Sequence, residues 1–179
     1  EHSHHHHGVD PHAWLNPQNA ALWLDAIAAD LVSKDPDNAA TYKSNADAAK
    51  AKVDALDKEL ATELAGAKDK PFIVYHDAYG YFTDHYGLPA ALAVTGGSGG
   101  APSAAQLSEI KAAAQSGVTC AFPEANHDAR LINAAIEQSG VRLGGALDPE
   151  GSKVTQGPDL YLDVMKNLGK NITDCIAGK

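Results

Sequence analysis

The chain has 179 residues, of which 44% are hydrophobic and 21% are charged, as in an ordinary globular protein of one or two small domains. A net charge of -9 with only 14 Lys and Arg residues argues against binding to nucleic acid or anionic lipid, because both need a basic surface, and makes cations the more natural partners. No apolar run approaches the ~20 residues that a membrane span needs, and the first residues do not form a signal sequence, so we expect a soluble chain that is either mature or truncated at its start.

The chain begins with a histidine tract. Residues 1–8, EHSHHHHG, have low complexity and cannot bury a core, so we expect residues 1–11 to form a mobile His-rich segment. The tract is either an expression tag or a native loop that collects metal ions, and its interrupted pattern favours the native loop. The histidines that would act as auxiliary ligands are His2, His4, His5, His6 and His7.

Two helices are predicted next. Asn16 and Pro17 are typical of an N-cap and a first helical position, and the apolar residues after them predict a helix to about Ser33. Asp35 and Pro36 start a second helix, which contains no internal Gly or Pro and stops at Gly66. At a rise of about 1.5 Å per residue, roughly thirty residues would span about 45 Å, which is longer than a small lobe is wide. The second helix is therefore predicted to be a strut.

From Pro71 onward, short apolar runs alternate with helical segments, which is typical of a parallel sheet covered by helices. The predicted strands lie near residues 72–75, 91–94, 118–122 and 141–147, and the predicted helices lie near residues 78–86, 103–115, 129–138 and 159–176. A Gly-rich loop at residues 95–102 is expected to be flexible. The predicted fold class is thus α/β, with a four-stranded, mainly parallel sheet in a lobe formed by residues 67–179.

Ligands of open parallel sheets bind beyond the carboxyl ends of the strands, because loops from several strands meet there. His76 follows the first predicted strand, Glu124 follows the third and Asp148 follows the fourth. Such a mixed set of nitrogen and oxygen donors suits zinc, manganese or iron. The pattern predicts a metal site at this edge of the sheet.

Each of these residues also has a structural interpretation. His76 and Asp77 could start a helix, with Asp77 as its cap. Glu124 could be a turn or cap residue, and Asp148 before Pro149 fits a turn.

The remaining histidines and the cysteines are less specific. His12 precedes a helix N-cap and could equally pack beside Trp14, whereas His85 and His127 are predicted to be surface residues. Two cysteines are too few for a disulfide scaffold and too widely spaced for a zinc knuckle, so one structural disulfide or two buried thiols remain open.

Four motifs make the interpretation more specific. They are DPHAWLNP (10–17), YHDAYGYF (75–82), TCAFPE (119–124) and LDPEG (147–151). In this order, with a long helix between the first two, they closely resemble the zinc-specific solute-binding proteins of bacterial ABC importers, the ZnuA type. The resemblance covers nearly the whole chain. It implies two α/β lobes joined by one rigid helix, with the metal held in the cleft between the lobes.

The resemblance also implies roles for particular residues. His12 and His76 match histidine ligands of the family, and Asp148 matches a position at or near the metal. Glu124 remains a candidate to support these ligands. Manganese-binding relatives carry a carboxylate where His76 stands, and imidazole suits zinc better, so His76 favours zinc as the bound ion. Cys120 and Cys175 match a pair that forms a disulfide in some members, which implies an oxidising compartment.

The resemblance further implies a division of the chain. Residues 12–34 match only the end of the family's N-terminal lobe, residues 35–66 match the connecting helix, and residues 67–179 match the C-terminal metal-binding lobe. The family's first histidine ligand lies in the N-terminal lobe, ahead of the His-rich loop. We therefore expect this chain to bind metal weakly or differently, with a second protomer, a swapped assembly or the histidine tract supplying further donors.

The implied function is zinc binding in the periplasm, or at the cell surface of organisms without one, and delivery of zinc to an ABC permease. The chain is not expected to be an enzyme. The alternatives are a manganese- or iron-binding member of the same transport class, a periplasmic zinc buffer or adhesin, and a zinc-dependent hydrolase. The hydrolase is disfavoured because the sequence has no HExxH motif, although Glu124 could serve as a base.

Overall fold

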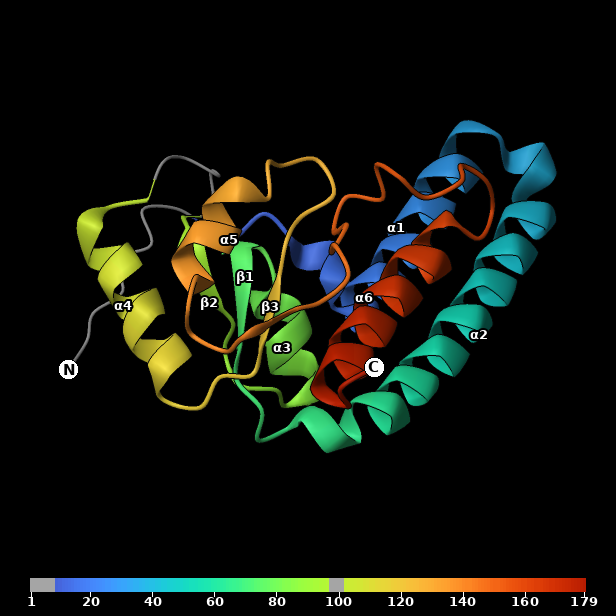
Figure 1. The fold of residues 1–179 in the computed structure, drawn as a ribbon. Coiled ribbons are helices and arrows are strands. Elements are labelled where there is room, and N and C mark those ends of the chain that lie inside the picture. Colours follow the sequence, from blue (N-terminus) through green and yellow to red (C-terminus); the bar gives the residue numbers. More distant parts are fainter. Residues whose placement is uncertain (1–8, 97–101) are drawn as a thin grey trace.

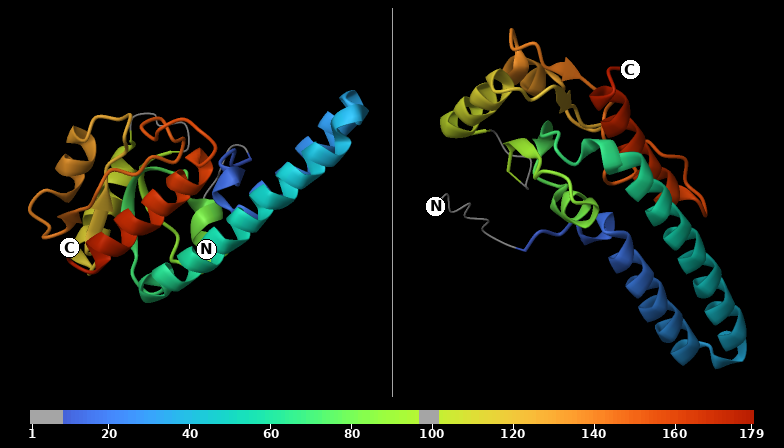
Figure 2. Two further views of the ribbon diagram at one scale, coloured as in Figure 1. Left: turned by 90° about the vertical axis from the view of Figure 1, so that its right-hand side faces the viewer. Right: turned by 90° about the horizontal axis from the view of Figure 1, so that it is seen from below.

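A computed structural model describes residues 9–96 and 102–179. Within these ranges the chain forms an α/β body from which two helices project as a hairpin (Figures 1 and 2). The histidine tract, with His2 and His4 to His7, and most of the Gly-rich loop at residues 95–102 lie outside the described residues. Among the helices of the described ranges, none is both long and apolar enough to cross a membrane.

The body contains a four-stranded sheet, within the described residues, whose neighbouring strands all pair in parallel. From one edge to the other its strands are β2 (Leu92–Thr95), β1 (Phe72–His76), β3 (Cys120–Phe122) and β4 (Arg142–Leu143). β1 lies inside the sheet and all five of its residues are buried, as is typical of a strand covered on both faces. The predicted α/β fold with a parallel sheet is confirmed.

The prediction of a long fourth strand at residues 141–147 is wrong. β4 ends at Leu143, and a Cβ atom on the next residue, Gly144, would lie 2.3 Å from the ring of Phe122. Glycine thus allows the backbone to pass close to Phe122 of the neighbouring strand, where any side chain at position 144 would clash. Pairing resumes at an isolated bridge between Glu124 and Leu147.

Helices cover both faces of the sheet. They are α3 (Gly80–Tyr86), α4 (Ala104–Gln115), α5 (Arg130–Ile136) and α6 (Leu160–Ile176), all close to the predicted ranges. Phe72 and Val74 of β1 belong to an apolar cluster with residues of α3 and α6, whereas Ile73 belongs to a second cluster with residues of α4 and α5. The alternation follows from the two-residue repeat of a strand, and it places the sheet between two layers of helices (Figure 1).

The hairpin consists of α1 (Pro17–Lys34) and α2 (Ala39–Glu63). α1 begins as predicted, because the side chain of Asn16 accepts a hydrogen bond from the backbone of Gln18 and Pro17 is the first helical residue. α2 has 25 residues, fewer than predicted, because short 3-10 turns occupy Pro36–Asn38 before it and Leu64–Ala67 after it. Its length is about 38 Å.

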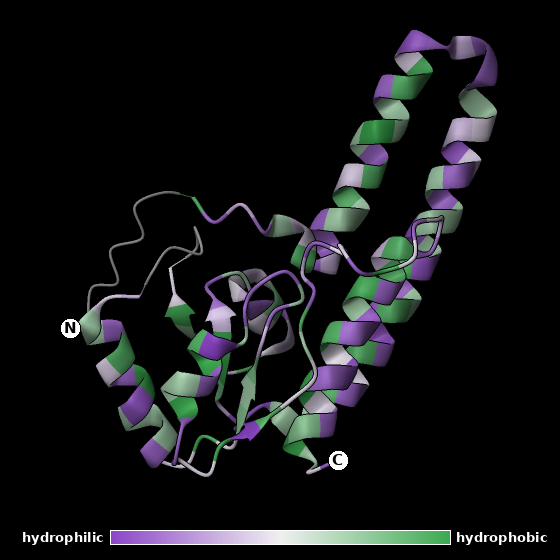
Figure 3. Ribbon diagram, turned by 45° about the horizontal axis from the view of Figure 1, so that its top comes forward, coloured by the Kyte–Doolittle hydropathy of each residue, from purple (hydrophilic) through white to green (hydrophobic). Residues whose placement is uncertain are grey.

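The two helices of the hairpin are packed differently. Near the body, Leu56 and Leu60 of α2 are buried, and a Leu60 methyl group lies close to Gly169 of α6. Along α1, four large apolar side chains are exposed, and Figure 3 shows the hydropathy of this helix. We call them the α1 stripe: Leu22, Trp23, Ile27 and Leu31. The stripe leaves apolar surface in water that a packed neighbour would cover.

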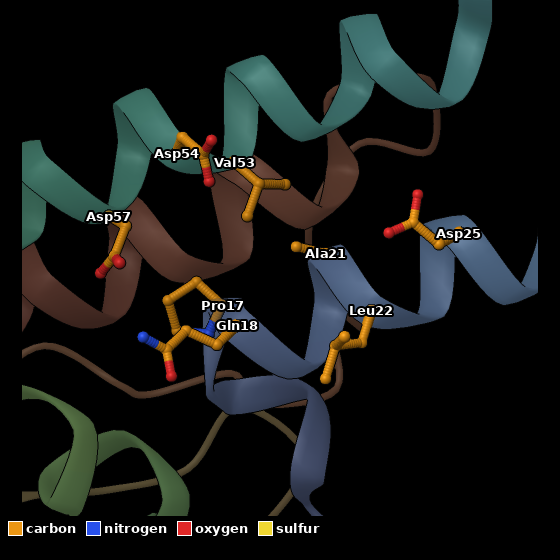
Figure 4. Close-up of a pocket in the computed structure, with 8 residues that line it drawn as sticks. All are labelled: Pro17, Gln18, Ala21, Leu22, Asp25, Val53, Asp54 and Asp57. Atoms are coloured by element: carbon orange, nitrogen blue, oxygen red, sulfur yellow. The ribbon is translucent and has the colours of Figure 1, made fainter. Parts of the chain in front are cut away.

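A groove of about 280 Å³ lies between α1 and α2 (Figure 4). Its lining residues are Pro17, Gln18, Ala21, Leu22, Asp25, Val53, Asp54 and Asp57. Asp25 pairs with Lys50 at 2.5 Å, and Asp57 pairs with Nε2 of His85 at 2.8 Å. The prediction that His85 is a surface residue is wrong, because its side chain is only 13% exposed and the contact with Asp57 holds its ring against α2.

Candidate metal centre

His76 and Glu124 meet at the carboxyl end of the sheet, as the strand-end argument predicts. His76 is the last residue of β1, and Glu124 follows β3 after one intervening residue. Nδ1 of His76 lies 2.6 Å from Oε2 of Glu124, and both side chains are buried. The helix-start interpretation of His76 and Asp77 is wrong, because α3 begins at Gly80 with Tyr79 as its N-cap.

Tyr79 contacts the same carboxylate oxygen as His76. Its hydroxyl donates to Oε2 of Glu124 at 3.1 Å. Burial raises the pKa of Tyr79 well above its ordinary value, and the negative charge of Glu124 raises the pKa further. The phenol therefore stays protonated and remains a donor. Glu124 is held by two buried partners, which supports a role in orienting His76.

His12 lies beside His76, although the two are far apart in the sequence. The ring centroids of His12 and His76 are 5.4 Å apart. His12 also packs beside Trp14, as its structural interpretation predicts, because the centroids of these two rings are 5.4 Å apart. Trp14 is fixed in turn by a hydrogen bond from its Nε1 to the carbonyl oxygen of Pro149, at 2.8 Å.

Asp10 holds His12 in the way that Glu124 holds His76. Oδ1 of Asp10 lies 2.7 Å from Nδ1 of His12 and accepts a hydrogen bond from the backbone nitrogen of His12 at 3.0 Å. A neutral imidazole that donates from Nδ1 to a carboxylate carries its lone pair on Nε2. Both buried histidines can therefore offer Nε2 to a metal ion, while a carboxylate fixes the orientation of each ring.

Asp148 lies at the same edge of the sheet, where its charge contributes to the raised pKa of Tyr79. Its Oδ1 accepts hydrogen bonds from the backbone nitrogen and the hydroxyl of Ser152, at 2.9 and 3.0 Å. Its Oδ2 accepts one from the backbone nitrogen of Lys153 at 2.7 Å. These contacts agree with the turn interpretation of Asp148, and its role as a ligand stays a prediction.

His127 is the residue of this region that the sequence-based reasoning missed. Its side chain is 36% exposed, as predicted for a surface residue, but its Nε2 lies 3.4 Å from Oε1 of Glu124. Its ring stacks on that of Tyr75 with centroids 4.3 Å apart. His76, Glu124 and His127 each offer one ligand atom within 4.8 Å of the others. The sequence signal that could have identified His127 is its position three residues after Glu124, in the turn that follows β3.

Cys120 and Cys175 form a disulfide that joins β3 to α6. The pairing implied by the resemblance is therefore present. Nearby, the guanidinium of Arg142 donates to the carbonyl oxygen of Cys175 at 2.7 Å. Together these contacts attach the last helix to the sheet on the side of β3 and β4.

The comparisons with known proteins agree with the α/β fold. The model of the family described as "Zinc-uptake complex component A periplasmic", ZnuA, matches residues 1–175. The chain belongs to this family. Its similarity therefore extends from the N-terminal segment to the end of α6.

Individual relatives support the same assignment. A high-affinity zinc uptake system protein ZnuA from Paracoccus denitrificans is 51% identical over 170 residues, covering 94% of this chain and 52% of the relative. The corresponding protein of Brucella suis is 43% identical, covering 94% of this chain and 50% of the relative. A crystal structure of ZnuA superimposes with a TM-score of 0.81 at 27% identity, covering 93% of this chain and 60% of that one. The chain thus spans about half the length of these two curated relatives.

Proposed function

We propose that this chain is the zinc-binding part of a solute-binding protein that captures zinc for an ABC importer. The observation that carries the proposal is the adjacent pair His12 and His76, each with Nδ1 held by a carboxylate and Nε2 available as a ligand. Imidazole nitrogen is a preferred ligand of zinc, whereas manganese favours harder oxygen donors. The names of the relatives, which describe zinc uptake, support the same ion.

Zinc sites take four donors, or three with a water molecule. In the proposed site His12 and His76 supply two, and Asp148 is the candidate for a third. A carboxylate oxygen has more than one lone pair, so Asp148 could bind the ion and keep hydrogen bonds to Ser152 and Lys153. Further donors would come from a part of the protein that lies across from this lobe.

We propose that such a part packs on the α1 stripe. In this arrangement residues 12–34 belong to a preceding lobe, residues 35–66 connect the lobes and residues 67–179 form the second lobe. Two observations support the division: the exposed apolar side chains of α1, and curated relatives about twice as long as this chain. The metal would then lie between two lobes, with His12 and His76 on this side.

Delivery to a permease in the periplasm is the transport role that fits best. The family description includes the periplasm, and the Cys120–Cys175 disulfide suits an oxidising compartment. A binding role is favoured over hydrolysis because Glu124, the candidate base, accepts hydrogen bonds at one oxygen from Tyr79 and His76. A carboxylate that orients a ligand in this way is a poor candidate for activating water at the metal.

The test is zinc titration of the full-length protein and its variants by competition with a chelator. We expect His12→Gln and His76→Asp each to weaken zinc binding by orders of magnitude, because each removes an imidazole ligand. The matched control is His85→Gln, which removes a histidine that is also paired with a carboxylate but lies on α3 against α2. Unchanged zinc affinity in His76→Asp would remove His76 from the site and overturn the proposal.

A further inference from the structure

His127 is placed for a role that the proposed function does not use. Its backbone nitrogen donates to the carbonyl oxygen of Glu124 at 3.1 Å, which closes a tight turn after β3. The stacked ring of Tyr75 fixes the plane of its imidazole, at an interplanar angle of 22°. The turn and the stacking together direct Nε2 of His127 toward Oε1 of Glu124, 3.4 Å away.

The distances in this cluster suit a tetrahedral ion. Ligand atoms that lie about 2.0–2.2 Å from a tetrahedral zinc ion are about 3.4 Å from one another. The separation between His127 and Glu124 already has this value. The hydrogen bond between His76 and Glu124, at 2.6 Å, would lengthen to about 3.4 Å when an ion replaces the proton between them.

The side chains of His76, Glu124 and His127 also differ in their exposure to solvent. The side chains of His76 and Glu124 are only 7% and 6% exposed, whereas that of His127 is 36% exposed. An ion that arrives from solvent therefore meets His127 before the buried pair. The Glu124 carboxylate supplies a negative charge, and all three donors come from the α/β lobe without help from α1 or its stripe.

We propose that His76, Glu124 and His127 form a loading position for zinc beside the His12–His76 pair. The inference rests on the proposed function, because the ion is the same cargo and His76 is shared. In the loading position zinc binds Nδ1 of His76, and the proton of that ring moves to Nε2. Transfer toward His12 returns the proton to Nδ1, restores the hydrogen bond to Glu124 and frees Nε2 to hold the ion. One neutral imidazole ring binds one ion, so the two positions are occupied alternately.

The test follows the ring nitrogens of the histidines in the 179-residue chain by 15N NMR during addition of zinc. Every variant carries the same N-terminal histidines, so differences between variants report on the cluster. In a His12→Gln chain we expect zinc to shift Nδ1 of His76 and Nε2 of His127. Adding His127→Gln should abolish these shifts and weaken zinc binding at the cluster by at least about tenfold.

A His85→Gln chain is the control and should show the same zinc-induced shifts as the unchanged chain. Zinc shifts at His12 and at Nε2 of His76, without any at His127, would overturn the loading position and leave the proposed function intact. Shifts at His127 in a chain where His12 and His76 Nε2 never respond would contradict the proposed His12–His76 pair instead. Because the His127 ring is partly exposed, its substitution should preserve the melting temperature, which shows that the variant is folded.

Discussion

Oε2 of Glu124 lies 2.6 Å from Nδ1 of His76, and both side chains are buried beyond the carboxyl end of β1. A Gln side chain at position 124 keeps the shape but loses the charge that holds the ring. We expect Glu124→Gln to weaken zinc binding about 10- to 100-fold, measured by chelator competition, because a carboxylate that orients a histidine ligand has an effect of this size. The exposed Glu137, when changed to Gln, should leave the affinity unchanged. Equal affinities of the two variants would exclude an orienting role for Glu124.

The hydrogen bond from Tyr79 to Glu124 predicts a pH dependence of stability. Burial raises the pKa of Tyr79 above the ordinary value of 10.0, whereas in the unfolded chain the phenol ionises near that value. The contribution of Tyr79 to the free energy of unfolding is therefore complete below about pH 10 and is lost as the pH rises further. Urea denaturation should show a shallower decline above about pH 10 in Tyr79→Phe than in the unchanged protein. The control Tyr81→Phe removes a phenol two residues further along the chain, in the first turn of α3, and identical slopes in both variants would contradict the expectation.

The disulfide predicts a large effect of reduction. Cys120 and Cys175 are 55 residues apart, and in the chain-entropy model closing a loop of this size stabilises the folded state by about 4 kcal/mol. Urea denaturation with and without a reducing agent measures the difference. The variant with both cysteines changed to Ser should be less stable than the oxidised protein, and its stability should be the same with and without the reducing agent. If the reducing agent destabilised that double variant as well, the effect would not belong to this disulfide.

Gly144 predicts a packing effect at the end of β4. A Cβ atom there would lie 2.3 Å from the Phe122 ring, so Gly144→Ala should displace the ring and destabilise the protein by about 1–3 kcal/mol. Gly66→Ala is a matched control, because nothing lies within 4 Å of a Cβ at Gly66. Thermal unfolding of both variants is the measurement. Similar melting temperatures would show that Phe122 yields without cost.

Local sequence signals predicted much of this fold. Asn16 with Pro17 marked the start of α1, and the apolar runs located all four strands to within a few residues, because capping and burial are encoded in neighbouring residues. The length of the fourth strand was not predictable in this way. It depends on the approach of Gly144 to Phe122, which is a contact between separate strands.

The site was predicted in part for a similar reason. The strand-end rule brought His76 and Glu124 together from the sequence, because it depends only on the order of strands in a parallel sheet. The rule does not report side-chain direction. It therefore did not show that Glu124 would contact both His76 and His127, nor that the ring of His85 would turn toward Asp57.

The unequal packing of the hairpin implies a gradient of local stability along it. Near the body, Leu56 and Leu60 of α2 are buried, whereas the side chains of the α1 stripe are 39–65% exposed. Backbone amides at the tip should exchange with deuterium much faster than those at the base, because local opening there disrupts few buried contacts. Any neighbour that covers the stripe would slow this exchange.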